Sequence, residues 1–169
     1  MLHIYCGDGK GKTTCSMGLA VRAAGHGRKV VVAQFLKCGN SGERTVLEQL
    51  PNVTLLPVPE ITKFVFAMTE EEKAQTRTQM GEILTRAIAE SRDADLLVLD
   101  ELNGAISTGM VAPEAVLAFL DSCPDGLEVV ITGRDPAPEL RQRADYITEM
   151  KKVKHPFDKG QNARKGVEW

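Results

Sequence analysis

The sequence predicts an α/β fold in which a largely parallel sheet of about six strands carries helices on both faces. Short apolar, β-branched runs alternate with segments of helical character along the whole chain, and this alternation is typical of parallel sheets with crossover helices. The run at 29–36, Lys-Val-Val-Val-Ala-Gln-Phe-Leu, is continuously apolar, as in strands covered on both faces. The 169 residues suffice for one domain, 1–169, with a full hydrophobic core.

The first third of the chain supplies three predicted strands. We expect the helix after the first strand to end at Gly25 and Gly27, because glycine is favoured at helix C-caps. The predicted elements are, in order, a strand over 2–6, a helix over 12–24, a strand over 29–36, a helix over 43–50 and a strand over 53–56.

A proline-containing loop over 57–68 leads into the longest predicted helix. Thr69 and Glu72 form the T-x-x-E pattern of a capping box, which predicts that the helix starts here. An apolar stripe at helical spacing predicts the face that packs on the sheet, and its members are Met80, Ile83, Leu84, Ala87 and Ile88.

The rest of the chain continues the alternation, with Pro113 in the first turn of one helix. The predicted elements are a strand over 96–99, a helix from 113, a strand over 127–132, a short helix near 139–143 and a strand over 146–149. Ligands of such sheets bind beyond the carboxyl ends of the strands. Residues 7–13, 34–37, 100–101 and 133–134 are expected there.

Composition excludes several classes of function. The net charge of −2 argues against a protein held on nucleic acid by bulk electrostatics. The longest aliphatic run, 96–99, is too short to span a membrane, and the chain enters its first strand without room for a signal peptide. Because Cys6, Cys15, Cys38 and Cys123 show neither C-x-x-C pairing nor partnered histidines, we expect no zinc site, no disulfide framework and a cytoplasmic location.

Residues 5–14 read Tyr-Cys-Gly-Asp-Gly-Lys-Gly-Lys-Thr-Thr and predict a phosphate-binding loop. Glycines at 7, 9 and 11 permit positive φ, so that N–H groups converge on an anion at a helix N-terminus. Lys12 adds a cation, and the Thr13 hydroxyl suits Mg²⁺. The usual G-x-x-x-x-G-K-[ST] spacing would place glycine where Cys6 stands. A glycine-rich turn that merely contains Gly-Lys-Thr is the alternative. The residues predicted to bind the triphosphate are Gly7, Asp8, Gly9, Lys10, Gly11, Lys12, Thr13 and Thr14.

Two further strand ends carry candidate ligands. Asp100 and Glu101 follow an apolar run, and beside a phosphate loop such carboxylates are expected to hold Mg²⁺ (or Mn²⁺) with Thr13. Either carboxylate is compatible with direct metal contact, and a helix cap is the alternative reading. Arg134 leaves another strand after a glycine, where it reaches a triphosphate or lies in solvent.

Several motifs occur in one order along the chain: Gly-Asp-Gly-Lys-Gly-Lys-Thr-Thr at 7–14, Arg-Ala-Ala-Gly-His-Gly at 22–27, Gln-Phe-Leu-Lys at 34–37, Gly-Glu-Arg at 42–44, Val-Leu-Asp-Glu-Leu at 98–102, Ile-Thr-Gly-Arg at 131–134 and Lys-His-Pro-Phe-Asp at 154–158. Over nearly its whole length the chain thus resembles the P-loop type of ATP:corrinoid adenosyltransferase. The family loop, G-N-G-K-G-K-T-T, has the same shortened spacing and differs only at Asp8. A carboxylate beside phosphates is unfavourable unless it faces away or meets a metal.

The resemblance implies a P-loop NTPase-like (RecA-like) three-layer fold and a reaction. Reduced Co(I) of a corrinoid attacks the ribose C5′ of ATP, and inorganic triphosphate leaves. The implied catalytic residues are Lys12, Thr13 and Glu101. Cobalt is the nucleophile, so no protein nucleophile is required. The site must instead stabilise charge on the leaving triphosphate.

The resemblance also implies further site residues and partners. Arg22 matches a family position near ATP, and Phe64 and Phe66 match an aromatic-x-aromatic segment thought to cover the lower face of the corrin. Their alternative is ordinary packing under a loop. An electron donor such as a flavoprotein and a homodimer are implied as well. Longer members carry an extension before the first strand that is thought to help cover the corrinoid site in a homodimer. This sequence lacks it, so the resemblance implies a homodimer less directly than the other properties.

Two other classes remain open on the residues alone. A P-loop ATPase or kinase would break the β–γ bond, with Glu101 orienting water or an acceptor hydroxyl. A non-catalytic module would switch a partner through loops ordered by the γ-phosphate. The sequence leaves open which corrinoid is preferred, which reductase serves it, and whether the role is salvage or de novo synthesis.

Overall fold

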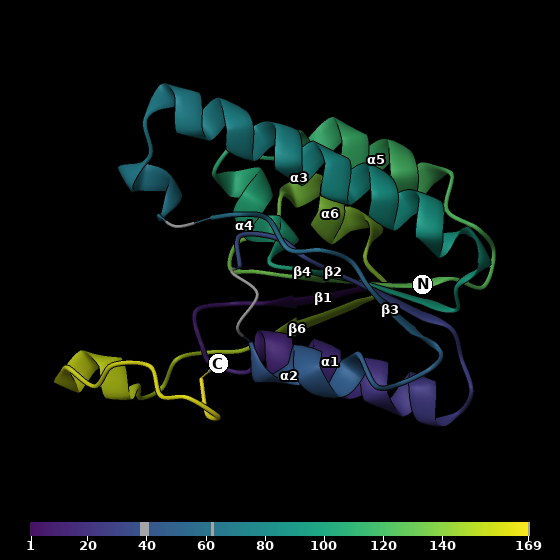
Figure 1. Ribbon diagram of the computed structural model, residues 1–169, viewed down its shortest axis with the longest axis horizontal. Helices are drawn as coiled ribbons and strands as arrows, with labels where there is room; N and C mark the ends of the chain where they lie inside the picture. The colour runs from purple at the N-terminus through teal and green to yellow at the C-terminus, as the bar shows by residue number, and fades with distance from the viewer. Residues whose placement is uncertain (38–40, 62, 169) are drawn as a thin grey trace.

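The computed structural model describes residues 1–37, 41–61 and 63–168 and places a parallel sheet between two layers of helices (Figure 1). Within these residues the sheet has six strands in the order β3-β2-β4-β5-β1-β6, and every described pairing is parallel. The strands are β1 Leu2–Cys6, β2 Val30–Gln34, β3 Val53–Leu55, β4 Leu96–Asp100, β5 Glu128–Thr132 and β6 Tyr146–Glu149. The predicted three-layer α/β fold is confirmed.

The helices divide between the two faces of the sheet. Figure 1 shows α1 and α2 on one face and α3 to α6 on the other, with the C-terminal segment beside α1 and α2. The helices are α1 Lys12–Gly25, α2 Gly42–Leu47, α3 Glu70–Glu90, α4 Leu102–Ser107, α5 Pro113–Asp121 and α6 Pro138–Arg143, with short 3-10 turns η1 Val65–Ala67, η2 Ser91–Asp93 and η3 Pro156–Lys159.

The core consists of two apolar clusters, one on each face of the sheet. Alternate residues of one strand enter different clusters: Leu97 and Leu99 of β4 face α3 to α6, whereas Leu96 and Val98 face α1. All five residues of β4 are buried, which explains the continuous apolar run in the sequence.

The start of α3 follows the sequence prediction. The Thr69 side chain accepts a hydrogen bond from the Glu72 N–H at 3.2 Å, and the Glu72 carboxylate accepts one from the Thr69 N–H at 2.8 Å. Of the apolar stripe, Met80, Leu84 and Ala87 are buried, and Ile83 and Ile88 pack against the same cluster. The capping box and the sheet-facing stripe are both confirmed.

The structure corrects several boundaries. Helix α4, six residues long with a glycine inside it, was not predicted, because so short a segment has weak periodicity. Strand β4 includes Asp100, which pairs in register with Gln34, so this carboxylate belongs to the strand and does not follow it. Helix α1 includes Gly25, and the residue with positive φ beyond its C-cap is Gly27, at 75°.

Candidate nucleotide-binding site

The phosphate loop connects the carboxyl end of β1 to the amino end of α1. Gly7 and Gly11 have φ values of 99° and 113°, which glycine adopts without steric cost. The prediction of positive φ at Gly9 is wrong. There the requirement is space, because a Cβ would come within 2.5 Å of the backbone oxygen of Met150. The loop thus depends on glycine for two different reasons.

Lys12 lies over the loop, as a phosphate-binding lysine should. Its ammonium donates hydrogen bonds to the carbonyl oxygens of Gly7 and Gly9, each at 2.8 Å. It is thereby held above the N–H groups at the start of α1, where a bound anion would be stabilised by the helix N-terminus.

Asp8 and Lys10 both face the C-terminal segment. The Asp8 carboxylate accepts a hydrogen bond from the Lys152 N–H at 2.9 Å, and this bond lowers the pKa of Asp8. Lys10 donates to the carbonyl oxygen of Val167 at 2.9 Å. The aspartate that departs from the family loop therefore has a backbone partner and faces away.

Asp100 is the centre of the site and is fully buried. Its Oδ1 accepts hydrogen bonds from Thr13 at 3.0 Å and from Thr132 at 2.7 Å. Its Oδ2 accepts bonds from Lys37 at 2.7 Å and from Gln34 at 3.3 Å. These hydrogen bonds compensate the buried carboxylate for its loss of hydration. The predicted juxtaposition of Thr13 with the acidic strand end is confirmed.

Glu101 adopts a left-handed backbone conformation, with φ 61° and ψ 19°, which is uncommon for a residue with a side chain. Its N–H donates to the Thr132 hydroxyl at 2.9 Å. It occupies the N-cap position of α4, but within the described residues its side chain makes no capping hydrogen bond. Burial, followed by the charge of Asp100, raises the pKa of Glu101. The helix-cap reading of this carboxylate is therefore not supported.

The oxygen atoms around Thr13 fit a Mg²⁺ ion. A hydroxyl and a buried carboxylate are the hard donors that Mg²⁺ prefers, and this ion commonly uses one or two protein carboxylates together with substrate phosphates and waters. Within the described residues no group of three or more His, Cys, Asp and Glu side chains could hold a metal. An all-protein cage is therefore not the arrangement this site offers.

Sequence reasoning placed residues 34–37 at this edge of the sheet but gave Gln34 and Lys37 no role, and it missed Thr132. Gln34 and Thr132 are the last residues of β2 and β5, and Lys37 follows β2 by three residues. At each of these strand ends a polar side chain interrupts the apolar run. That interruption was the available signal. Gln34 is itself oriented by Arg44, which donates to its Oε1 at 3.0 Å. Cys38 lies outside the described residues.

A cavity of about 560 Å³ lies against the start of α1, and residues from the chain end form one of its walls. Its lining residues are Thr13, Thr14, Met17, Lys37, Gly42, Glu43, Val46, Glu101, Gly166, Val167 and Glu168. Glu168 accepts hydrogen bonds from the Arg164 N–H at 2.8 Å and from its guanidinium at 3.1 Å, which lower its pKa to about 2. This ion pair fixes the turn over residues 164–168.

The two predicted arginines are placed differently. The Arg134 carbonyl accepts a hydrogen bond from the Gly7 N–H at 2.9 Å, so this residue adjoins the phosphate loop. Arg22 stands ten residues after Lys12 on α1, about 15 Å along the helix axis. It lines another cavity, with His3, His26 and Tyr146 among its neighbours. The structure does not bring Arg22 to the phosphate loop.

Phe64 and Phe66 are 78% and 88% exposed. Their rings stack on each other with centroids 5.5 Å apart and planes inclined by 6°. Between them, Val65 packs against the core. Figure 1 places the segment before α3 at the same end of the sheet as the phosphate loop. Because both rings are exposed, the alternative that they are ordinary packing under a loop is wrong.

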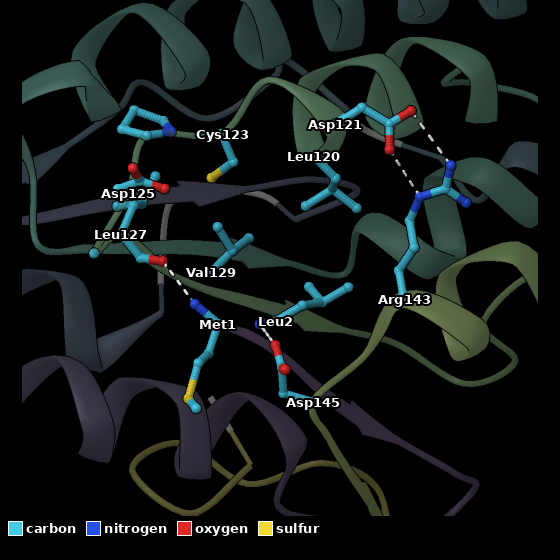
Figure 2. A pocket seen from close by; sticks show the side chains of 12 residues that line it. Met1, Leu2, Leu120, Asp121, Cys123, Asp125, Leu127, Val129, Arg143 and Asp145 are labelled. Carbon is cyan, nitrogen blue, oxygen red and sulfur yellow. Dashed lines mark hydrogen bonds and ion pairs between the residues drawn. The ribbon is translucent and has the colours of Figure 1, made fainter.

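Another cavity, of about 330 Å³, lies at the opposite edge of the sheet, around the amino ends of β1 and β5 (Figure 2). Its polar groups pair with one another: the Leu2 N–H donates to Asp145 at 2.7 Å, and Arg143 binds Asp121 at 3.0 Å. It includes none of the predicted site residues, and we assign it no function.

Comparison with known proteins identifies the family of this chain. The family model described as ATP:corrinoid adenosyltransferase BtuR/CobO/CobP matches residues 1–169. A corrinoid adenosyltransferase of Pseudomonas aeruginosa is 34% identical over all of this chain and 83% of its own length. Corrinoid adenosyltransferase CobA of Salmonella typhimurium is 36% identical over all of this chain and 85% of its own.

A solved structure supports the fold class. EssC (ATPases 2 and 3) from Geobacillus thermodenitrificans superimposes with a TM-score of 0.54 at 17% identity, over 98% of this chain and 34% of that one. In the part of the chain that the structure describes, no helix is long and apolar enough to cross a membrane. The full-length family match, together with the phosphate loop and its acidic partner, shows that the chain belongs to the ATP:corrinoid adenosyltransferases, enzymes that transfer the adenosyl group of ATP to a corrinoid.

Proposed function

We propose that this enzyme catalyses attack of reduced corrinoid Co(I) on the ribose C5′ of ATP, with release of intact inorganic triphosphate. The C5′–O bond breaks and both of its electrons leave with the triphosphate. Cobalt supplies the electron pair of the new Co–C bond and becomes Co(III). The observation that carries the proposal is the phosphate loop with Lys12 above it, next to the Thr13–Asp100 pair.

In this proposal the chain's main task is to stabilise the leaving group. Lys12 and the N–H groups at the start of α1 bind the triphosphate, and Arg134 adds a cation beside the loop. Such preorganised donors act most strongly where charge develops in the transition state. The loop glycines that fix these N–H groups are therefore as necessary to the reaction as Lys12.

Thr13 and Asp100 are proposed to hold a Mg²⁺ ion (or Mn²⁺), with Glu101 next to them. When bound, the ion supplies positive charge to the triphosphate oxygens. The direct bond between Thr13 and Asp100 favours Asp100 over Glu101 as the carboxylate nearer the metal. Glu101 follows Asp100 directly in the chain and lines the same cavity as Thr13, so it is proposed as the second carboxylate near the ion.

Phe64 and Phe66 are proposed to bind the corrinoid. Two exposed, stacked phenylalanines offer a flat apolar surface that can pack against the face of a corrin macrocycle. Exposed aromatic rings of this kind are costly to leave in water and are a mark of binding surfaces. Arg22 keeps its proposed role near ATP only if the nucleotide extends along α1.

The remaining parts of the proposal concern the setting of the reaction. An electron donor such as a flavoprotein is proposed to supply the reduced cobalt, because Co(I) has to be formed by reduction of the corrinoid before it can attack ATP. Cys6, Cys15 and Cys123 are free thiols, which suits a cytoplasmic location. A homodimer would supply cover for the exposed corrinoid surface.

Product analysis tests the proposed function. Purified enzyme receives ATP, Mg²⁺ and chemically reduced corrinoid, and phosphorus products are separated by ion-exchange chromatography. Intact triphosphate in equal amount to adenosylated corrinoid is expected. ADP with phosphate would identify an ATPase, and absence of turnover would favour a binding module. A reaction without corrinoid serves as the control for hydrolysis.

A further inference from the structure

Lys37 occupies an unusual position for a residue outside the phosphate-loop motif. Its ammonium donates to Asp100 Oδ2 at 2.7 Å and to Thr13 Oγ1 at 2.9 Å. It therefore binds the same hydroxyl and carboxylate that suit a Mg²⁺ ion. Its side chain is 24% exposed and lines the cavity beside the start of α1.

An ammonium and a magnesium ion cannot both bind these oxygens closely. Mg²⁺ requires oxygen ligands at about 2.0–2.1 Å, and an ion at that distance from Thr13 or Asp100 would meet the positive charge of Lys37 within a few ångströms. Repulsion between the two cations is strong at a partly buried site. Entry of the metal therefore requires the lysine to move.

The Lys37 side chain has room to move into the adjacent cavity. Its four-carbon stem is flexible, and the cavity into which it can move also contains Thr13, Thr14 and the start of α1, where a triphosphate would lie. Glu43 lines the same cavity, with Oε1 at 3.9 Å from the ammonium. A lysine released from Asp100 thus has a short path to phosphate oxygens.

We propose that Lys37 is a further catalytic residue, a cation that exchanges places with Mg²⁺ at Thr13 and Asp100 and then binds the leaving triphosphate. Before metal binding it neutralises the buried Asp100. Afterwards it donates hydrogen bonds to the triphosphate without transferring a proton. Its charge then stabilises the electrons that the triphosphate gains as the C5′–O bond breaks. This inference rests on the proposed function of the site.

Metal and triphosphate binding test the exchange without corrinoid or turnover, so the outcome is separate from that of the proposed function. In Lys37→Met, the dissociation constant of Mn²⁺, measured by electron paramagnetic resonance of the free ion, is expected to fall at least about tenfold, because a competing cation has been removed. The dissociation constant of inorganic triphosphate at saturating Mg²⁺ is expected to rise about tenfold or more, because a charged hydrogen bond is lost. Lys73→Met is the matched control, since Lys73 pairs with Glu70 at 2.8 Å on α3.

A measurement on the unmodified enzyme keeps the test decisive if Lys37→Met is unstable. Brief acetylation of lysines is followed by mass spectrometry. Compared with enzyme without added ligand, Mg²⁺ alone should increase labelling of Lys37, and Mg²⁺ with inorganic triphosphate should decrease it. Labelling of Lys73 should be the same in all three conditions. Equal labelling of Lys37 in all three conditions, or unchanged triphosphate affinity in Lys37→Met, would show that Lys37 is a fixed ion pair and overturn the proposal.

Discussion

The Thr13 hydroxyl lies 3.0 Å from Oδ1 of Asp100, although 87 residues separate them in the chain. They meet because α1 packs across β1, β5 and β4, so that its first turn stands above the end of β4. β5 lies between the other two strands and supplies Thr132, which donates to the same Asp100 oxygen at 2.7 Å. The site thus depends on strand order as much as on the loop sequence.

Replacing Lys12 tests the phosphate loop. Lys12→Ala removes a cation that matters most as charge develops on the triphosphate, so kcat should fall by about 10²–10³-fold while the fold is retained. Initial rates with ATP and chemically reduced corrinoid measure the effect, and circular dichroism checks the fold. A correctly folded variant with near-normal kcat would remove this loop from catalysis.

Replacing the oxygen ligands tests the metal site. Thr13→Ala and Glu101→Ala should each raise the Mg²⁺ concentration needed for half-maximal activity and lower the maximal rate, because each removes an oxygen near the ion. Thr13→Ser keeps the hydroxyl and serves as the control. If metal titration curves match those of the unmodified enzyme in both alanine variants, neither residue belongs to the site.

The stacked phenylalanines are tested by comparing two oxidation states of the substrate. A Phe64→Ala, Phe66→Ala double variant should keep substantial transfer with Co(I) supplied and lose it when bound Co(II) must first be reduced. The family resemblance implies that the two rings displace the lower axial ligand of cobalt, and loss of this ligand lowers the energy of the orbital that accepts the electron. The spectrum of bound Co(II) should shift from four- to five-coordinate. Equal losses with both substrates and an unchanged spectrum would leave the rings without this function.

Two glycines provide a matched test of the loop packing. In Gly9→Ala the new Cβ would approach the Met150 backbone oxygen to 2.5 Å, and such overpacking should lower the free energy of unfolding by about 1–3 kcal/mol. In Gly18→Ala the Cβ meets no described atom within 4 Å apart from the neighbouring backbone of its own helix, and replacing a helical glycine should stabilise the fold by roughly 0.5–1 kcal/mol. Urea unfolding measures both. Equal effects would contradict the close approach.

The raised pKa of Glu101 predicts a pH-dependent difference in stability. Burial raises this pKa above its unfolded value, so the folded state binds the proton more strongly. The stabilisation is present below the unfolded pKa, near 4.5, and is lost as pH rises through the folded pKa. The free energy of unfolding of Glu101→Gln, relative to that of the unmodified enzyme, should therefore be higher at pH 7 than at pH 4. Thermal unfolding at both pH values measures it, and a constant difference would contradict the shift.

The sequence by itself determined the features that depend on short-range spacing. The phosphate loop at residues 7–14, the capping box of Thr69 and Glu72 and the alternation of apolar strands with helices each occupy one continuous segment. Their physical causes are local as well: glycine φ angles, side-chain hydrogen bonds three residues apart and burial of a strand on both faces. The resemblance to a family then supplied a reaction that these local features alone left open.

Only the tertiary structure decided which side chains share the site. Lys37, Thr132 and Asp100 lie on three different strand ends, and alternation does not determine strand order. Nor does it bring residues 164–168 back to Lys10, a contact that spans 157 positions. The distance of Arg22 from the loop, by contrast, follows from the predicted helix itself, because ten residues of helix span about 15 Å along the axis. Contacts between distant segments depend on how the whole sheet packs, and no local pattern encodes them.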